Sequence, residues 1–235
     1  MNQDKLDVYE QIGVAMTCRS FQEYVDMFQL SSDMFVGTIL DVAAGASSFT
    51  AEANRKGFQS IAVDPRYALD PKSIYEHGKR ETKAATEKLA NLLDTYDWDY
   101  YGSLQAHEQN REHSLELFFE DYRGDTRHQR YVEGSLPNLP VVDNSFSLIL
   151  CSHFLFLYEG QFNVQFHLGA IQELVRVCKS GGQILIYPLV TFTGEPYPQL
   201  DELKTVLKSE GIVTEQIPTT FRFLKGANHV LRITK

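Results

Sequence analysis

The chain has few cysteines and no long hydrophobic run, and both shortages exclude whole classes of protein. Its three cysteines, Cys18, Cys151 and Cys178, are far apart, odd in number and without C-x-x-C spacing. Neither a disulfide framework nor a structural metal site is therefore expected. No apolar run reaches the roughly 18 residues of a transmembrane helix. The N-terminus, M-N-Q-D-K-L-D, lacks the basic-then-apolar pattern of a signal peptide. We expect a cytoplasmic protein.

Positive charge is also in short supply. The 22 Lys and Arg residues face 31 Asp and Glu residues, which gives a formal net charge of −9. This balance argues against a surface that broadly attracts nucleic acid or an anionic membrane, although a local basic groove is not excluded. Small-molecule or protein substrates are favoured. The 235 residues suffice for one α/β domain with an insertion.

The region after residue 37 reads as a strand, a tight turn, a helix and a second strand. The two strands, residues 39–42 and 60–63, are short and apolar. The serines at 47–48 can cap the helix between them, because a hydroxyl accepts hydrogen bonds from N–H groups of the first turn. Gly57 suits the left-handed stop of that helix. These features predict a βαβ unit.

Acidic and small residues stand where the two strands end. Asp41 lies near the end of the first strand, small side chains occupy residues 43–46, and Asp64 ends the second strand. A βαβ unit with such a turn, and a carboxylate about 20 residues on, is a nucleotide-binding arrangement. Asp64 is the candidate to accept both hydroxyls of a ribose. On its own the stretch also fits an ordinary α/β turn, which is rich in the same small residues.

The N-terminal residues, 1–37, are expected to cover the ligand crevice. Residues 1–17 read as a helix or an ordered arm whose side chains available for burial are Leu6, Val8, Tyr9 and Ile12. A clearer helix begins at Ser20, because S-F-Q-E is a capping box completed by Glu23. Its apolar face consists of Phe21, Tyr24, Val25 and Phe28. Since this helix precedes the first strand, Arg19 and Tyr24 are candidate contacts to the polar end of a ligand.

An inserted helical pair is expected at residues 68–129. About 65 residues separate the second strand from the next, far more than a usual connection. Asp70-Pro71 is a cap followed by a first helical residue, and a second helix is expected at 103–122. The pair would pack over an edge or the mouth of the sheet, as a lid or part of an acceptor pocket. His107 and His113 are six residues apart, so we expect them to face solvent rather than bind a metal.

The rest of the chain continues the α/β alternation. A short strand ends at Gly134, and a buried strand follows at residues 146–151. An amphipathic helix at 163–178 is expected to end at Gly181-Gly182. The remaining elements are a strand at 183–189, a helix at 198–210, and strands at 212–217 and 229–233 that pair antiparallel. Ser152 and His153 follow the buried strand, at the edge where open α/β sheets bind ligands.

Four segments together resemble the class I S-adenosylmethionine-dependent methyltransferases over nearly the whole chain. D-V-A-A-G-A-S-S-F resembles the glycine-rich first motif, and A-V-D-P-R-Y resembles the acid-ended second strand. V-E-G-S-L-P-N-L-P-V-V-D-N-S-F-S-L-I-L-C-S-H and R-V-C-K-S-G-G-Q-I-L-I resemble the later motifs. The resemblance implies a single domain, residues 1–235, with a doubly wound, Rossmann-like sheet of seven strands, mostly parallel with an antiparallel last strand. It also implies S-adenosylmethionine as cofactor and S-adenosylhomocysteine as product.

The resemblance assigns a role to each matching residue. The backbone of Ala43 and Gly45 would line the methionine and the ribose, with Ser47 in the same loop. Asp64, beside Pro65, would bind the ribose. Ser135 and Leu136 would face adenine, and Asp41 would lie near the methionine amine. Cys151, Ser152 and His153 would lie beneath the sulfonium.

Some positions depart from the family pattern. Ala43 and Ser47 replace glycines but are small, so the ligand can still approach the backbone closely. Ser135 replaces the acid that normally reaches the adenine amino group, and Ser147 replaces an aspartate. A serine hydroxyl still accepts a hydrogen bond, so we expect cofactor binding to be retained.

Methyl transfer needs a base only if the nucleophile arrives protonated. His153 is the candidate base by position and by its ordinary pKa; the alternative is a histidine merely hydrogen-bonded at the cofactor floor.

We expect a small-molecule methyltransferase of undetermined oligomeric state, with no extended nucleic-acid surface and no membrane partner. An RNA or protein methyltransferase would need a basic or extended docking surface. A non-catalytic S-adenosylmethionine-binding protein is favoured by Ser135 and Ser147 and opposed by the intact polar strand ends. A dinucleotide dehydrogenase would normally keep G-x-G-x-x-G, which is absent.

Overall fold

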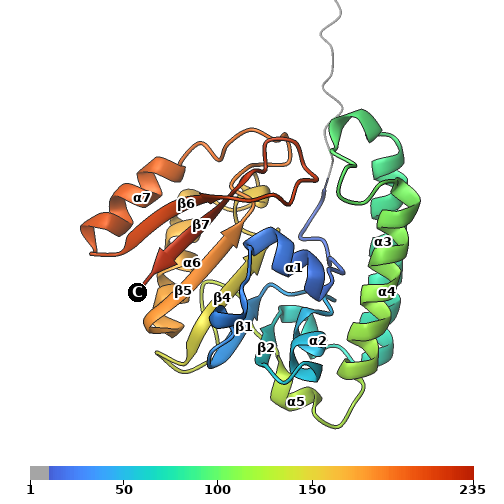
Figure 1. The fold of residues 1–235 in the computed structure, drawn as a ribbon, viewed down its shortest axis with the longest axis horizontal. Coiled ribbons are helices and arrows are strands. Elements are labelled where there is room, and N and C mark those ends of the chain that lie inside the picture. The colour runs from blue at the N-terminus through green and yellow to red at the C-terminus, as the bar shows by residue number, and fades with distance from the viewer. Residues whose placement is uncertain (1–10) are drawn as a thin grey trace, which may run out of the picture.

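The computed structural model describes residues 11–235 (Figure 1). Leu6, Val8 and Tyr9, which we expected to be buried, lie outside this range. Ile12 is 99% exposed, so its expected burial was wrong. Of the two alternatives predicted for the N-terminus, the described part is an arm, because residues 11–19 form no helix.

Seven strands form one sheet in the order β3-β2-β1-β4-β5-β7-β6. They are β1 (Thr38–Val42), β2 (Gln59–Val63), β3 (Tyr131–Val132), β4 (Phe146–Ser152), β5 (Cys178–Tyr187), β6 (Val213–Pro218) and β7 (His229–Thr234). β7 is antiparallel to both of its neighbours, and the other pairs are parallel. The predicted doubly wound sheet with an antiparallel last strand is confirmed.

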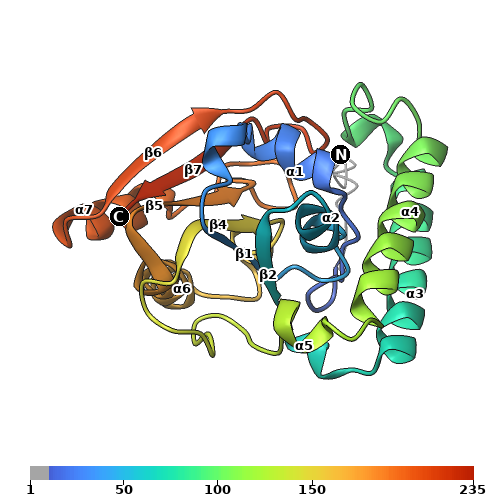
Figure 2. The ribbon, with the colours of Figure 1, turned by 60° about the horizontal axis from the view of Figure 1, so that its bottom comes forward.

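The helices lie on both faces of the sheet and beside it (Figure 2). They are α1 (Phe21–Phe28), α2 (Phe49–Arg55), α3 (Pro71–Ala90), α4 (Leu104–Tyr122), α5 (Arg127–Arg130), α6 (Val164–Val177) and α7 (Leu200–Ser209), with short 3-10 turns at Ser32–Met34, Pro65–Ala68, Leu93–Thr95 and Phe156–Tyr158. α1 and α2 cover one face and α6 the other. Within the described residues, no helix is long and apolar enough to cross a membrane.

The starts of several helices follow local hydrogen-bonding rules. The capping box of α1 is present: Ser20 accepts from the N–H of Glu23, and the Glu23 carboxylate accepts from the N–H of Ser20. Asp70 caps α3 and is followed by Pro71, as predicted. At α2 the Ser47 hydroxyl accepts from the N–H of Phe49, whereas the Ser48 side chain makes no cap bond.

α3 and α4 lie side by side, beside α2 and the β2–β3 end of the sheet (Figures 1 and 2). They can approach closely because Gly78 of α3 has no side chain. A Cβ there would lie 2.6 Å from a methyl of Leu115 on α4 and 3.2 Å from the side chain of Met16 in the arm. The helical pair therefore packs against the arm as well as against itself.

The role predicted for Gly181-Gly182 was wrong. α6 ends at Val177 and β5 begins at Cys178, so Gly181-Gly182 do not stop the helix. They lie in an irregularity of β5, between the pairs Phe146↔Cys178 and Leu148↔Gln183. Gly181 has φ +76°, and a Cβ on Gly182 would lie 3.0 Å from the carbonyl oxygen of Ser147. These glycines allow a bulge beside β4.

Candidate functional site

The carboxyl ends of β1 and β4 lie next to each other at the centre of the sheet. The chain leaves β1 towards β2 on one side, whereas β4 and β5 extend the sheet on the other. Such a switch point opens a crevice in which α/β proteins bind ligands. The loops after β1, β2 and β4 meet there, and the arm crosses above them.

The loop after β1 is held in an unusual conformation. Ala43 and Gly45 have φ values of +55° and +58°. Gly45 N–H donates to Asp64 Oδ2 at 3.0 Å, and its carbonyl accepts from the Tyr67 hydroxyl at 2.9 Å. A Cβ on Gly45 would lie 3.0 Å from the carbonyl oxygen of Thr17 in the arm. Both the left-handed backbone and this close approach favour glycine at position 45.

Asp64 connects two loops of the site. Its Oδ2 accepts from Gly45, and its Oδ1 accepts from Arg66 N–H at 2.8 Å. The residue is buried, and burial raises the pKa of its carboxyl despite the hydrogen bonds from Arg66 and Gly45. Each carboxylate oxygen has two acceptor positions. Asp64 therefore retains acceptor capacity for a ligand.

A first cavity, of about 230 Å³, lies above the ends of β1 and β2. It brings together five predicted cofactor residues: Ala43, Asp64, Pro65, Ser135 and Leu136. The rest of its lining is mainly apolar and comprises Val14, Val42, Arg66, Gly134, Phe154, Phe162 and Phe166. A polar group that can take two hydroxyls therefore lies beside surfaces suited to a flat ring.

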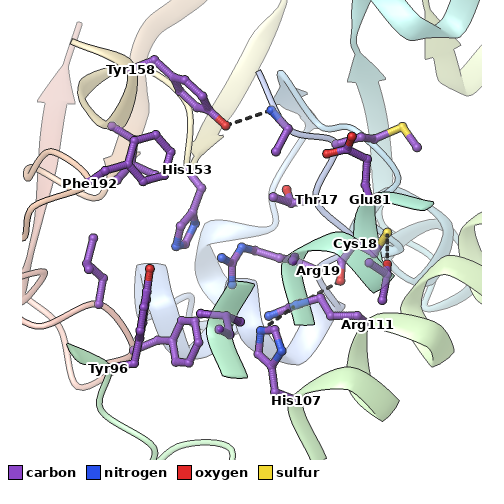
Figure 3. A pocket seen from close by; sticks show the side chains of 18 residues that line it. Thr17, Cys18, Arg19, Glu81, Tyr96, His107, Arg111, His153, Tyr158 and Phe192 are labelled. Carbon is purple, nitrogen blue, oxygen red and sulfur yellow. Dashed lines mark hydrogen bonds between the residues drawn. The ribbon is translucent and has the colours of Figure 1, made fainter. Parts of the chain in front are cut away.

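A second cavity, of about 110 Å³, lies between the arm, the insertion and the loop after β4 (Figure 3). Arg19 and His153 line it, and Figure 3 shows both side chains pointing into it. α3 contributes Glu81, Thr82, Ala85 and Leu89. Its remaining walls come from the arm, α4 and the later loops: Ala15, Met16, Thr17, Cys18, Tyr96, His107, Arg111, Leu157, Tyr158, Phe192, Phe223 and Leu224.

The arm forms the partition between the two cavities. Val14 lines the first and Ala15 the second. Ala15 N–H donates to the Tyr158 hydroxyl at 2.9 Å, and the Arg66 guanidinium donates to the Val14 carbonyl. The two cavities are thus neighbours, separated by a segment that hydrogen bonds hold from both sides.

A buried cluster of charges fixes Arg19. Its Nη1 donates to Glu23 at 3.3 Å and to the Tyr101 hydroxyl at 3.4 Å. Arg111 of α4 donates to both oxygens of Glu23, at 2.9 and 2.5 Å, and to the Cys18 carbonyl. Burial raises the pKa of Glu23, but the charges of Arg111 and Arg19 outweigh it and hold that pKa at about 2. The cluster carries one net positive charge, and Arg19 Nε has no partner among the described residues.

His153 follows β4 with φ +51°, and its N–H donates to the Tyr187 carbonyl at 2.6 Å. Its Nδ1 lies 2.9 Å from the Ser152 hydroxyl, which is 3.4 Å from Met27 Sδ. A hydroxyl has one proton and Met27 Sδ can only accept. For both contacts to be hydrogen bonds, the ring proton must be on Nδ1, leaving a lone pair on Nε2. Burial, and then the charges of Arg19 and Arg111, lower the pKa of His153 well below its usual value.

His107 is buried, and its expected exposure was wrong. Its ring stacks on Phe223, with centroids 4.9 Å apart, and its Nε2 accepts from Arg111 Nε at 3.2 Å. Burial and the charge of Arg111 lower its pKa to about 2. His113 is exposed. Within residues 11–235, no group of three or more His, Cys, Asp or Glu side chains is arranged to hold a metal ion.

Four other predicted site residues line neither cavity and lie behind the walls: Tyr24, Asp41, Ser47 and Cys151. The Tyr24 hydroxyl donates to Asp41 Oδ1 at 3.0 Å. Burial raises the pKa of Asp41 well above its usual value, and its Oδ2 has no partner among the described residues. Ser47 donates to the Arg19 carbonyl at 2.8 Å. The Cys151 thiol is fully buried, as are the other two thiols, and burial raises its pKa to about 12.

Sequence reasoning missed several residues that shape the site. Glu23 was assigned only to the capping box, yet it also binds Arg111. Tyr67 and Tyr158 tie the loops and the arm together through their hydroxyls. A partial signal existed for Glu23, because an acid at that capping position is already oriented towards Ser20. Nothing local marks Arg111, whose partner is 88 residues away.

The strand order, with an antiparallel β7, and the carboxylate after β2 define a Rossmann-like methyltransferase fold. A family model described as "Methyltransferase domain" matches residues 90–186. The uncharacterized protein MJ0045 of Methanocaldococcus jannaschii is 35% identical over 218 residues, which covers 92% of this chain and 94% of that protein. The chain belongs to the class I S-adenosylmethionine-dependent methyltransferase family. Its cofactor is S-adenosylmethionine.

Solved structures are similar at lower identity. A TehB-like S-adenosylmethionine-dependent methyltransferase from Corynebacterium glutamicum is 14% identical, with a TM-score of 0.47 over 85% of this chain and 80% of that one. A S-adenosylmethionine-dependent methyltransferase from Aquifex aeolicus is 13% identical, with a TM-score of 0.43 over 90% of each chain.

Proposed function

We propose that the protein transfers a methyl group from S-adenosylmethionine to a small-molecule acceptor bound in the second cavity. The observation that carries this proposal is the pair of adjoining cavities at one switch point. The first holds the ribose and adenine candidates, and the second holds Arg19 and His153. Val14 and Ala15 of the arm line the first and the second cavity respectively, so a cofactor in the first cavity would present its other end to the second.

The residues present fit the cofactor. Asp64 has acceptor positions left for two ribose hydroxyls, and Ser135 and Leu136 lie in the same cavity for adenine. Arg19 keeps one buried donor without a partner among the described residues, Nε, for a carboxylate. Asp41 lies behind the cavity walls, and its orphaned Oδ2 would gain a partner from the ammonium at the same end of the cofactor, directly or through a bridging water.

The bound cofactor supplies a methyl group already activated by a positively charged sulfur. The protein must then bind the acceptor, align it and keep water out. His153 lines the second cavity, and its Nε2 can accept a hydrogen bond from the acceptor. The aromatic rings around the crevice, such as Phe154 and Tyr158, offer faces that suit a cation.

Titration calorimetry with S-adenosylhomocysteine tests the proposal directly. We expect one binding site per chain. Adenosine should bind more weakly, because it lacks the carboxylate that Arg19 would bind and the ammonium group that Asp41 would bind. Absence of binding by S-adenosylhomocysteine would overturn the proposed function.

Asp41→Asn is expected to make the protein more stable and to weaken its cofactor binding. The carboxyl of Asp41 has a raised pKa in the folded state, so folding is favoured below the ordinary pKa and loses that advantage as pH rises. The introduced amide carries no charge, so the folded variant does not lose stability in this way as pH rises. We expect a gain of about 1 kcal/mol above neutral pH and a cofactor affinity about tenfold lower, because the acceptor for the ammonium is gone.

Urea unfolding from pH 4 to pH 9 and calorimetry measure these two effects. The gain in stability should grow with pH, since it reflects the ionisation of Asp41. Asp125→Asn, at an exposed position, is the matched control and should change neither quantity. A variant that binds S-adenosylhomocysteine with unchanged affinity would refute the assigned role of Asp41.

A further inference from the structure

Glu81 is the one acid among residues 11–235 that lines the second cavity (Figure 3). It comes from α3 and shares the lining with Arg19 and Arg111. Those two guanidinium groups pair with Glu23. In the described chain, the basic side chain within ion-pair distance of Glu81 is His77, 3.8 Å away on the same helix. Whether Glu81 is neutralised therefore depends on the charge of His77.

His77 does not neutralise Glu81. Burial, and then the charge of Arg66, lower the pKa of His77, so its ring carries little charge at neutral pH. Its Nε2 is 3.8 Å from Glu81 Oε1, too far for a hydrogen bond, and has no hydrogen-bond partner among residues 11–235. The Glu81 carboxylate therefore keeps its negative charge and its acceptor positions for a ligand.

The charge of Glu81 reaches two sides of the cavity. Burial raises the pKa of the Cys18 thiol and of the Tyr158 hydroxyl, and the charge of Glu81 adds to both rises. Figure 3 shows Glu81 on the side of Cys18, with Phe192 and Tyr96 across the cavity. The Glu81 side chain is 30% exposed. A cation bound there would keep part of its water and avoid much of the cost of burying a charge.

Next to Glu81 the cavity is small and has apolar walls. The apolar side chains that form these walls are Ala85, Leu89, Leu157, Phe192, Phe223 and Leu224. The volume is about 110 Å³. An engineered apolar cavity of about 150 Å³ in another protein holds one benzene molecule. The cavity therefore suits an apolar body of about one six-membered ring, with a polar group directed towards Glu81.

The net positive charge beside the cavity already has a partner in the proposed function. Arg19, Arg111 and Glu23 together carry one positive charge, which the carboxylate of the cofactor would offset. Glu81 is then the charged group that the acceptor meets. A protonated amine would balance this charge, whereas a carboxylate on the acceptor would add a second negative charge.

We propose that the acceptor is a small amine: an apolar body of about one ring with a protonated amino group that the Glu81 carboxylate binds. This proposal rests on the proposed methyltransferase function. Glu81 selects the acceptor by charge, and the apolar walls select it by size. A neutral compound of the same shape would fill the space between the walls but leave the carboxylate without a cation.

Benzylamine and benzyl alcohol are a matched pair of probes, because they share a ring and differ in charge. With S-adenosylhomocysteine bound, we expect benzylamine to bind at least about tenfold more tightly than benzyl alcohol, because hydrogen bonds between charged groups are the stronger ones. Titration calorimetry measures both affinities. Benzylamine that does not bind, or that binds no more tightly than the alcohol, would overturn the proposal.

Glu81→Gln tests whether the carboxylate is the group that selects the amine. The amide keeps the size of the side chain and removes its charge, so the preference for benzylamine should disappear while benzyl alcohol binds as before. Glu87→Gln is the matched control, because it makes the same charge change on the same helix at an exposed position that does not line the cavity. It should leave the preference intact. A preference that survives in Glu81→Gln would contradict the role given to Glu81.

The positive sulfur of S-adenosylmethionine is the other cation that Glu81 could serve. S-adenosylhomocysteine lacks this charge, so the two cofactor forms separate the cases. If Glu81 binds the acceptor, Glu81→Gln should bind both forms as the unaltered protein does. A loss of affinity for S-adenosylmethionine alone would assign the carboxylate to the sulfonium and refute the inference.

The outcomes also separate this inference from the proposed function. If S-adenosylhomocysteine does not bind the unaltered protein, the proposed function fails and the inference fails with it. If S-adenosylhomocysteine binds but benzylamine has no advantage over benzyl alcohol, the inference alone is overturned.

Discussion

Replacing Arg111 with methionine is expected to lower the free energy of unfolding by about 3 kcal/mol. Glu23 is fully buried, and Arg111 provides its two shorter ion-pair contacts. Breaking a buried pair by removing one partner typically costs about 3–5 kcal/mol, because the remaining charge is left uncompensated. Arg19 stays 3.3 Å from Glu23, which places the expected loss at the lower end of that range.

The loss should depend on pH in a way that identifies Glu23. In the folded protein the pKa of Glu23 is held at about 2, below its ordinary value of about 4.3. A lowered pKa contributes stability that is present above the ordinary value and disappears as pH falls through the folded one. The difference between the unaltered protein and Arg111→Met should therefore be largest at neutral pH and shrink between pH 5 and pH 2.

Urea unfolding at several pH values measures this effect, and α4 provides a matched control. Arg123 follows the end of the helix and pairs with Glu120, but both side chains are about half exposed. Arg123→Met should change stability by less than about 1 kcal/mol. The double variant Glu23→Gln/Arg111→Met should recover part of the loss, since the buried charge is then gone. A loss for Arg111→Met that does not vary with pH would contradict the role given to Glu23.

The ion pair of Arg111 with Glu23 also connects the helical insertion to α1 and the arm. Arg111 comes from α4, Glu23 from α1, and the Cys18 carbonyl that Arg111 also binds comes from the arm. We infer that the insertion holds Arg19 in place through Glu23, rather than acting as an independent lid. In Arg111→Met, the affinity for S-adenosylhomocysteine should fall more than the affinity for adenosine, which has no carboxylate.

The sheet could be predicted from the sequence because its determinants are local. Each central strand is a short apolar run. The N-termini of α1 and α3 are marked by side chains that accept hydrogen bonds from the first turn of the same helix. The position of Asp64 after β2 follows from the same pattern. A resemblance in four segments then placed the elements in order.

What could not be predicted depends on distant contacts or on backbone conformation. Ala43 was judged by size alone, yet it adopts φ +55°, a conformation that glycine reaches without the steric cost that alanine bears. The exposure of His107 was inferred from helix periodicity, but Phe223, more than 100 residues later, covers its ring. At the bulge, a Cβ on Gly182 would lie 3.0 Å from the Ser147 carbonyl oxygen, an atom of the neighbouring strand that the local sequence does not reveal. Helix-ending and bulge-forming glycines have the same local pattern.

Asp64→Asn is expected to lower the affinity for S-adenosylhomocysteine about 100-fold while leaving the fold intact. The amide keeps one acceptor oxygen but turns the other into a donor. That donor would face the N–H of Gly45 or the N–H of Arg66, and a ribose hydroxyl on the same side would lose its acceptor. Losing hydrogen bonds to a charged acceptor costs about 1.5–3 kcal/mol each. Losing one of the two backbone hydrogen bonds should lower the stability by about 1 kcal/mol, and part of this loss is offset because burial already disfavours the charged form of Asp64.

Comparing two ligands distinguishes a ribose contact from general damage to the site. Asp64→Asn should lower the affinities for adenosine and for S-adenosylhomocysteine by similar factors, because both ligands carry the ribose. Asp41→Asn should lower the affinity for S-adenosylhomocysteine alone, because adenosine has no ammonium group. Asp70→Asn is the matched control: the amide still caps α3, and neither affinity should change. If Asp64→Asn left adenosine binding unaltered, the carboxylate after β2 would not bind the ribose, and its role would be limited to joining the loops through Gly45 and Arg66.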